Sequence, residues 1–176
     1  RRFTELLSGQ AYNVRVTYEY DLNDGNGNRI IYGNNSISTI AKTLPTVTLT
    51  KGGEYQEFLT FSISENDPNS CGSVNSIKLL KNNSIIQTAS TVSQRQFTGL
   101  LSNTSYTIRL DYRYDLNDGF GEQTILRTVD MKTVAKTTPI VEINNIVSGT
   151  DYVSFEIDVY DIDNLGGVSS VGLYQD

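Results

Sequence analysis

Acidic and amide side chains gather in two copies of one short segment that could bind a cation. Each copy reads Asp-Leu-Asn-Asp-Gly, and its oxygen-bearing residues are Asp21, Asn23, Asp24, Asp115, Asn117 and Asp118. Carboxylate and amide oxygens are the hard ligands that calcium takes. The spacing departs from the EF-hand pattern, and no glutamate stands at its twelfth position. A calcium site of another kind at Asp115, Asn117 and Asp118 stays open.

The same segment fits two other uses. Asn and Asp side chains hydrogen-bond nearby backbone and close tight turns, and Gly119 and Gly121 can supply positive φ angles. This structural interpretation is the one we favour. Alternatively, Tyr114, Asn117 and Phe120 resemble the mixture of polar and aromatic residues at a binding surface, which could hold a carbohydrate.

Catalytic chemistry has little support in the sequence. There is no histidine, so no imidazole can activate the only cysteine, Cys71. Asp111 and Asp115 could suggest the paired carboxylates of a glycosidase, but on one strand they would point to solvent. We therefore predict a protein that is not an enzyme.

The acidic loops follow long predicted strands. In 106–114 and again in 12–20, apolar or aromatic residues occupy every second position. A period of two that is rich in β-branched and aromatic residues predicts a strand with one buried face. The loop after each strand then begins at Asp115 or Asp21.

The two strands belong to a repeat with an offset of 94 residues. Residues 1–45 match 95–139 without a gap, and the following part aligns more weakly. Pro45 and Pro139 each follow Ala-Lys-Thr-x, and proline is tolerated at the first residue of an edge strand. We therefore predict one complete domain over 45–138.

The remaining segments would then be parts of neighbouring domains. Residues 1–44 correspond to the C-terminal half of a preceding domain, and 139–176 to the N-terminal half of a following one. Within the complete domain we expect seven strands, over 46–50, 57–64, 74–80, 85–86, 94–98, 106–114 and 123–133. Short strands at this spacing without helices predict an all-β fold of tandem antiparallel sandwiches.

The amino-acid composition limits the classes of partner that this chain can bind. The chain has 11 Tyr, 6 Phe and no Trp, which is typical of an extracellular β-protein. A net charge of −6 argues against nucleic acid, because binding to phosphates rests on Lys and Arg. No apolar run approaches the roughly 18 residues of a membrane span, so we expect no membrane insertion.

Two segments resemble the tyrosine corner of fibronectin type III domains. Residues 100–106 read Leu-Leu-Ser-Asn-Thr-Ser-Tyr and are similar to the Leu-x-Pro-x-Thr-x-Tyr pattern of that family, with Ser102 in place of the usual proline. The resemblance assigns the corner to Leu100 and Tyr106, and in the first copy to Leu6 and Tyr12. In such a corner the tyrosine hydroxyl bonds a backbone group upstream and fixes the crossing between two sheets.

Other features depart from that family. The tryptophan usual in its second strand is missing, and residues 74–82 look more like a strand of bacterial immunoglobulin-like modules. Tandem modules with such loops also resemble those in tail proteins of phages and prophages of Gram-positive bacteria. The resemblance implies an extracellular, virion-tail or bacterial-surface location. It also implies a structural spacer, or alternatively an adhesion module that binds a surface glycan or protein.

Sandwich topology predicts where the acidic loop lies. In this type of fold the loop after the sixth strand shares a pole with 65–73, and that pole faces the preceding module. We therefore expect 115–121 to pack against the linker 41–45, with neighbouring modules of the same chain as partners. A short linker would add to a semi-rigid arrangement.

Overall fold

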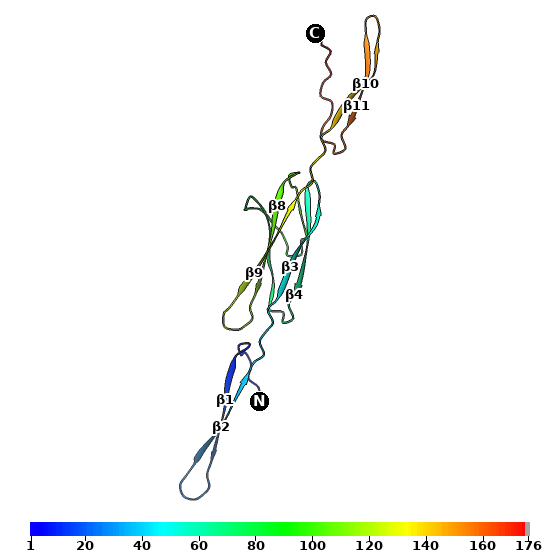
Figure 1. The fold of residues 1–176 in the computed structure, drawn as a ribbon. Helices are drawn as coiled ribbons and strands as arrows, with labels where there is room; N and C mark the ends of the chain where they lie inside the picture. Colours follow the sequence, from blue (N-terminus) through cyan, green and yellow to red (C-terminus); the bar gives the residue numbers. More distant parts are fainter. Residues whose placement is uncertain (175–176) are drawn as a thin grey trace.

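The described residues form antiparallel strands joined by loops, as Figure 1 shows. The computed structural model describes residues 1–174. Gln175 and Asp176, the last residues of the predicted half-domain 139–176, lie outside the described residues. No helix occurs within 1–174, which confirms the all-β prediction at the level of fold class.

Two sheets form the central part of the chain. The first has the order β3-β4-β7, with strands β3 (Thr46–Glu54), β4 (Phe58–Asn66) and β7 (Gln96–Thr98). The second has the order β6-β5-β8-β9, with strands β6 (Ser84–Thr88), β5 (Gly72–Lys81), β8 (Ser105–Tyr114) and β9 (Gln123–Lys132). Every neighbouring pair is antiparallel, so the two sheets make a sandwich-like unit.

Alternating side chains from both sheets make one hydrophobic core. Along β8 every second residue is buried, beginning with Tyr106 and ending with Tyr114. Tyr112 is fully buried, and Phe61 and Phe97 of the other sheet stack at 5.7 Å between ring centroids. The buried hydrophobic residues are Val47, Leu49, Leu59, Phe61, Val74, Ile77, Leu79, Phe97, Leu100, Tyr106, Ile108, Leu110, Tyr112, Tyr114 and Met131.

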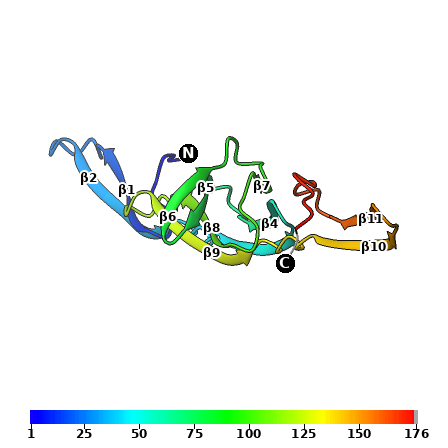
Figure 2. The ribbon, with the colours of Figure 1, turned by 90° about the horizontal axis from the view of Figure 1, so that it is seen from above.

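Two hairpins lie at opposite ends of this central unit (Figures 1 and 2). One is formed by β1 (Ala11–Tyr20) and β2 (Arg29–Ser38), the other by β10 (Ile140–Ser148) and β11 (Val153–Tyr160). Among the described residues, each hairpin is a sheet of two strands without an opposing sheet. Every buried side chain in 1–174 belongs instead to 45–133.

All seven predicted strands occur, each with at least one bound shifted by one to four residues, and two of these shifts have identifiable reasons. β3 continues to Glu54, because a bulge between Lys51 and Glu54 carries its pairing with β4 past two glycines. β7 begins at Gln96 because the N–H of Gln94 closes a turn onto the carbonyl of Thr91, 3.2 Å away. A bulge in the pairing sets the end of β3, and a hydrogen-bonded turn sets the start of β7. Neither boundary follows from hydrophobic alternation.

A tyrosine and a threonine close the sandwich where β8 begins. The hydroxyl of Tyr106 accepts a hydrogen bond of 3.0 Å from the N–H of Leu101. The buried hydroxyl of Thr133 donates to the carbonyl of Leu101 at 2.6 Å and accepts from the N–H of Thr104 at 2.9 Å. The loop before β8 is therefore tied both to β8 itself and to the end of β9.

The first copy of the repeat contains the same arrangement. Tyr12 accepts from the N–H of Leu7 at 2.9 Å. Thr39 donates to the carbonyl of Leu7 at 2.6 Å and accepts from the N–H of Gln10 at 3.0 Å. In each copy a tyrosine and a threonine more than 25 residues apart thus hold the corner, in the hairpin as well as in the sandwich.

Replacing Tyr106 by Phe should destabilise the sandwich by about 1–3 kcal/mol. The ring would still fill the core, but the part-buried N–H of Leu101 would lose its acceptor. The free energy of unfolding in urea, followed by tyrosine fluorescence, measures the effect. Tyr12→Phe is the matched control, because the equivalent N–H of Leu7 is exposed and water can replace the hydroxyl. Equal losses in both variants would contradict this account of the corner.

Candidate functional site

The acidic loop between β8 and β9 is built from two successive turns closed by aspartate side chains. Oδ1 of Asp115 accepts from the N–H of Asn117 at 2.7 Å, and Oδ1 of Asp118 accepts from the N–H of Phe120 at 3.0 Å. Asn117 has a φ of 53° and Gly119 a φ of 95°, in the left-handed region that these residues tolerate. Both aspartate side chains therefore accept hydrogen bonds from the local backbone of the loop.

The loop of the first copy has the same geometry. Asp21 accepts from the N–H of Asn23 at 2.8 Å, and Asp24 accepts from the N–H of Asn26 at 3.1 Å. Asp24 also forms an ion pair with Arg29. These bonds explain why the sequence Asp-Leu-Asn-Asp-Gly occurs twice, since both loops need the same two turns.

The second loop also contacts the segment that precedes β1. The N–H of Ser8 donates to the carbonyl of Asn117 at 2.7 Å, and its hydroxyl donates to the carbonyl of Leu116 at 2.6 Å. The side-chain amide of Asn117 donates to the carbonyl of Leu6 at 3.1 Å. The hydrogen bonds of the loop thus go to the corner 6–8, whereas the sequence predicted packing against the linker 41–45.

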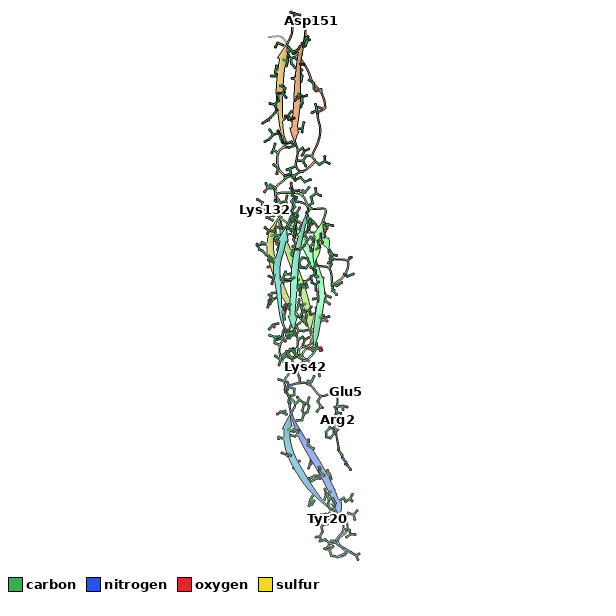
Figure 3. All side chains as sticks on the ribbon, turned by 90° about the vertical axis from the view of Figure 1, so that its right-hand side faces the viewer. Arg2, Glu5, Tyr20, Lys42, Lys132 and Asp151 are labelled. Atoms are coloured by element: carbon green, nitrogen blue, oxygen red, sulfur yellow. The ribbon has the colours of Figure 1, made fainter. Side chains whose placement is uncertain are left out.

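The linker is held by the neighbouring loop between β4 and β5. The N–H of Thr43 donates to Oδ1 of Asn69 at 2.7 Å. In Figure 3 the label of Lys42 lies where the chain passes from the first hairpin to the central sandwich. Pro45, the next residue but one after Thr43, is fully buried. Loop and linker therefore meet at one junction.

The same contact occurs at the other end of the sandwich. The N–H of Thr137 donates to the carboxylate of Asp163, and the side-chain amide of Gln56 donates to the same carboxylate at 2.5 Å. Thr137 and Asp163 follow Thr43 and Asn69 by the repeat offset of 94 residues. Bonds donated by Thr137 and Gln56 lower the pKa of Asp163.

An ion pair adds to this second junction. The ammonium of Lys136 lies 2.5 Å from the carboxylate of Glu57. The hydrogen bond to Glu57 raises the pKa of Lys136. The hydrogen bond between Thr43 and Asn69 was not predicted from the sequence. The repeat offset could have suggested this bond, because positions 43 and 69 and their counterparts 137 and 163 all carry polar residues.

The loop that presents Asn69 is organised by Asp67. Its carboxylate accepts from the N–H of Gly72 at 2.8 Å, from the hydroxyl of Tyr112 at 3.1 Å and from the thiol of Cys71 at 3.3 Å. A Cβ at Gly72 would lie 2.5 Å from the ring of Tyr112, so only glycine permits this close approach. At the third copy, Asp161 accepts from Gly166 at 2.9 Å.

Hydrogen bonding changes the titration of this group. Burial alone would raise the pKa of Asp67, but the bonds donated by Cys71, Gly72 and Tyr112 outweigh it and lower the pKa to about 2. Burial and the bond to Asp67 raise the pKa of Tyr112 to about 12. Burial also raises the pKa of Cys71. Cys71 is therefore a structural hydrogen-bond donor.

Two of the predicted site residues, Tyr114 and Asp115, line one hollow together with Glu122, and Phe120 is not part of its lining. Phe120 is 81% exposed at the tip of the loop, whereas Tyr114 belongs to the core. Glu122 pairs with Arg113 at 3.2 Å. Within residues 1–174 no three acidic, histidine or cysteine side chains form a group that could hold a metal ion. Calcium binding by the loop stays a prediction, which a melting temperature measured with and without EDTA decides.

Comparisons with known proteins gave no match to a family model, to a curated protein or to a solved structure. Across the part of the chain that the structure describes, no helix has the length and apolar character needed to span a bilayer.

Acid should remove the stabilisation that Asp67 provides. A carboxyl whose pKa is lower in the folded state stabilises fully above its unfolded pKa of about 3.9, and the contribution disappears as the pH falls through about 2. Asp67→Asn should therefore lower the free energy of unfolding clearly at pH 7 and little near pH 2. Urea unfolding of both proteins at several pH values measures the difference.

A direct titration provides the control. The carboxyl carbon of Asp67, followed by NMR, should titrate near pH 2 in the wild type and at higher pH in Tyr112→Phe, which lacks one of the donors. An equal cost of Asp67→Asn at both pH values would contradict the role assigned to this carboxylate.

Proposed function

We propose that this chain is a structural spacer built from tandem β-sandwich modules of the fibronectin type III or immunoglobulin-like kind. The strand order of the central unit, with β3-β4-β7 facing β6-β5-β8-β9, supports this assignment, as do the hydrogen-bonded tyrosines. Residues 45–138 are the complete module, and the segments on either side are halves of neighbouring modules. The chain is not an enzyme in this proposal.

One observation above all supports the spacer role. Equivalent hydrogen bonds join the linker to the adjacent loop at both junctions. Linker and loop meet through Thr43 and Asn69 at one end and through Thr137 and Asp163 at the other. The contacts of Ser8 with the loop 115–121 add to the first junction. Bonds repeated at successive junctions limit bending and favour a semi-rigid rod.

The composition fits an extracellular or virion-tail location, with a bacterial surface as the alternative. The partners in this proposal are the neighbouring modules of the same chain and other tail or surface proteins. Nucleic acid is not expected as a partner of a chain with a net charge of −6. Membrane insertion is not expected either, because no apolar run in the 176 residues approaches the roughly 18 of a membrane span.

Adhesion is the second candidate, and the exposed ring of Phe120 favours it. An aromatic face at a loop tip can stack on a sugar, and loops on a rigid sandwich commonly bind partners. A glycan array incubated with the 176-residue chain separates the two functions. The spacer should give no reproducible signal, whereas a signal lost in Phe120→Ala would replace the spacer with an adhesin.

Removing the junction bonds should loosen the first hairpin from the sandwich. The double variant Asn69→Ala and Asn117→Ala deletes two side-chain bonds, each worth about 0.5–1.5 kcal/mol. The ratio of docked to undocked arrangements should fall by about 5- to 150-fold. Spin labels on exposed cysteines introduced at Thr17 and Thr128, in a Cys71→Ser background, report the change as a broader distance distribution.

The matched control is Asn23→Ala in the first loop, away from either junction, because Asn23 precedes Asn117 by 94 residues and has nearly the same φ, 54° against 53°. Its distance distribution should stay as narrow as that of the parent. A double variant with an unchanged distribution would contradict the proposal that these bonds make the junction semi-rigid.

A further inference from the structure

The loop between β1 and β2 contains the pair Asn26-Gly27, the only asparagine followed by glycine in the 176 residues. The second loop holds Phe120 and Gly121 at the equivalent positions, 94 residues later. Over the seven residues that begin at Asp21, this is the only position at which the two loops differ. The first loop therefore carries a chemical group that the second one lacks.

Asn26 is exposed in a loop at the outer end of the first hairpin. In Figure 3 the label of Tyr20, the last residue of β1, marks that end. Phe120 is 81% exposed even though its own loop is hydrogen-bonded to Ser8 and to Leu6. Position 26 would therefore stay open to water if another segment docked on the first loop in the same way.

The peptide nitrogen of Gly27 is accessible from the side chain of Asn26. Gly27 has a φ of 74°, and a Cβ added to it would meet nothing within 4 Å. Within residues 1–174 its N–H donates no hydrogen bond. Because glycine has no side chain to screen this nitrogen, the nitrogen can approach Cγ of Asn26 at little steric cost.

The other asparagines of the two loops are less suited to such an approach. Asn23 and Asn117 are each followed by an aspartate, whose side chain screens its own peptide nitrogen and whose negative charge disfavours the deprotonated amide. Asn28 is followed by Arg29, and its side-chain amide donates to Glu19 at 2.7 Å. Asn117, which bonds across the first junction, is thus not expected to react.

We propose that Asn26 is a site of spontaneous deamidation, in which the peptide nitrogen of Gly27 displaces the side-chain amide of Asn26. A base removes the proton from the N–H of Gly27. A bond then forms between this nitrogen and Cγ of Asn26, and the bond between Cγ and Nδ2 breaks. Nδ2 takes up a proton and leaves as ammonia. The step gives a five-membered succinimide ring and needs neither an oxidant nor a reductant.

Water then opens the ring at one of its two carbonyl carbons. Attack at Cγ restores the ordinary main chain and leaves an aspartate at position 26. Attack at the main-chain carbonyl leaves the chain running through Cγ, as an isoaspartate. Either product replaces a neutral amide by a carboxylate, so the net charge becomes one unit more negative than −6.

The product should weaken the second turn of the first loop. Oδ1 of Asp24 accepts from the N–H of Asn26 at 3.1 Å, and bonds from the backbone and side-chain amides of Asn26 lower the pKa of Asp24. A carboxylate at position 26 would replace the side-chain donor by a like charge. This inference goes beyond the spacer role and does not depend on it.

Trypsin allows the two loops to be compared in one sample. Cleavage after Arg15 and Arg29 releases the peptide 16–29, and cleavage after Arg113 and Arg127 releases 114–127. The 176-residue chain is incubated at pH 8 before digestion and mass spectrometry. Replacement of ammonia by water should accumulate at Asn26 in the first peptide, with isoaspartate among the products, whereas the second peptide should stay unmodified.

Two variants exchange the chemistry of the loops. Asn26→Phe copies the second loop and should lose the modification. Phe120→Asn places an asparagine before Gly121 and should make the peptide 114–127 react. In Gly27→Ala the added methyl group screens the nitrogen, so the modification of Asn26 should be lost or strongly slowed. A synthetic peptide with the sequence of 16–29 gives the reference rate, which the intact chain should approach.

Three results would overturn the proposal. The first is an Asn26 that stays unchanged in the intact chain while the synthetic peptide reacts, because the folded loop would then protect it. The second is equal conversion of Asn23 or Asn28, which would show that Gly27 has no special part. The third is aspartate without isoaspartate, which would indicate direct attack of water on the side chain.

Discussion

Burial of the inward face of β8 is the constraint on which the rest of the structure depends. Five alternate side chains of this strand, from Tyr106 to Tyr114, are removed from water only because the sheet β3-β4-β7 covers them. Hydrophobic burial contributes about 25 cal/mol per Å2, and a strand with one apolar face has no other way to obtain it. In β1, which no second sheet covers among residues 1–174, the same pattern is exposed.

Polar bonds fix the geometry that burial leaves undetermined. Apolar contacts have no direction, so they can hold two sheets together without deciding where the connecting loops go. Thr133 and Asp67 supply direction, because each hydrogen-bonds a segment that is distant in sequence. Tyr106 adds a local tie between β8 and the loop that precedes it. The loops are then placed so that Asn69 can reach the linker. Apolar burial thus stabilises the sandwich, whereas polar hydrogen bonds determine the geometry of the junctions.

Much of the fold could be predicted from the sequence, whereas most of the site could not. The alternation in 106–114 indicated a strand with one buried face, and the paired loops indicated tight turns. The contact of Asn117 with Leu6 could not be derived, because the segments are 111 residues apart. The role of Thr133 was also missed, since a threonine at the end of a strand carries no periodic signal.

The sequence by itself determined the period of the repeat, the all-β class and which face of each strand is apolar. These follow from local properties, because side-chain alternation and turn chemistry act over a few residues. Only the tertiary structure decided which loops meet, which carboxylate gathers Cys71, Gly72 and Tyr112, and which apolar faces remain uncovered. Those outcomes depend on how far-apart segments come together in space, and no local pattern encodes that arrangement.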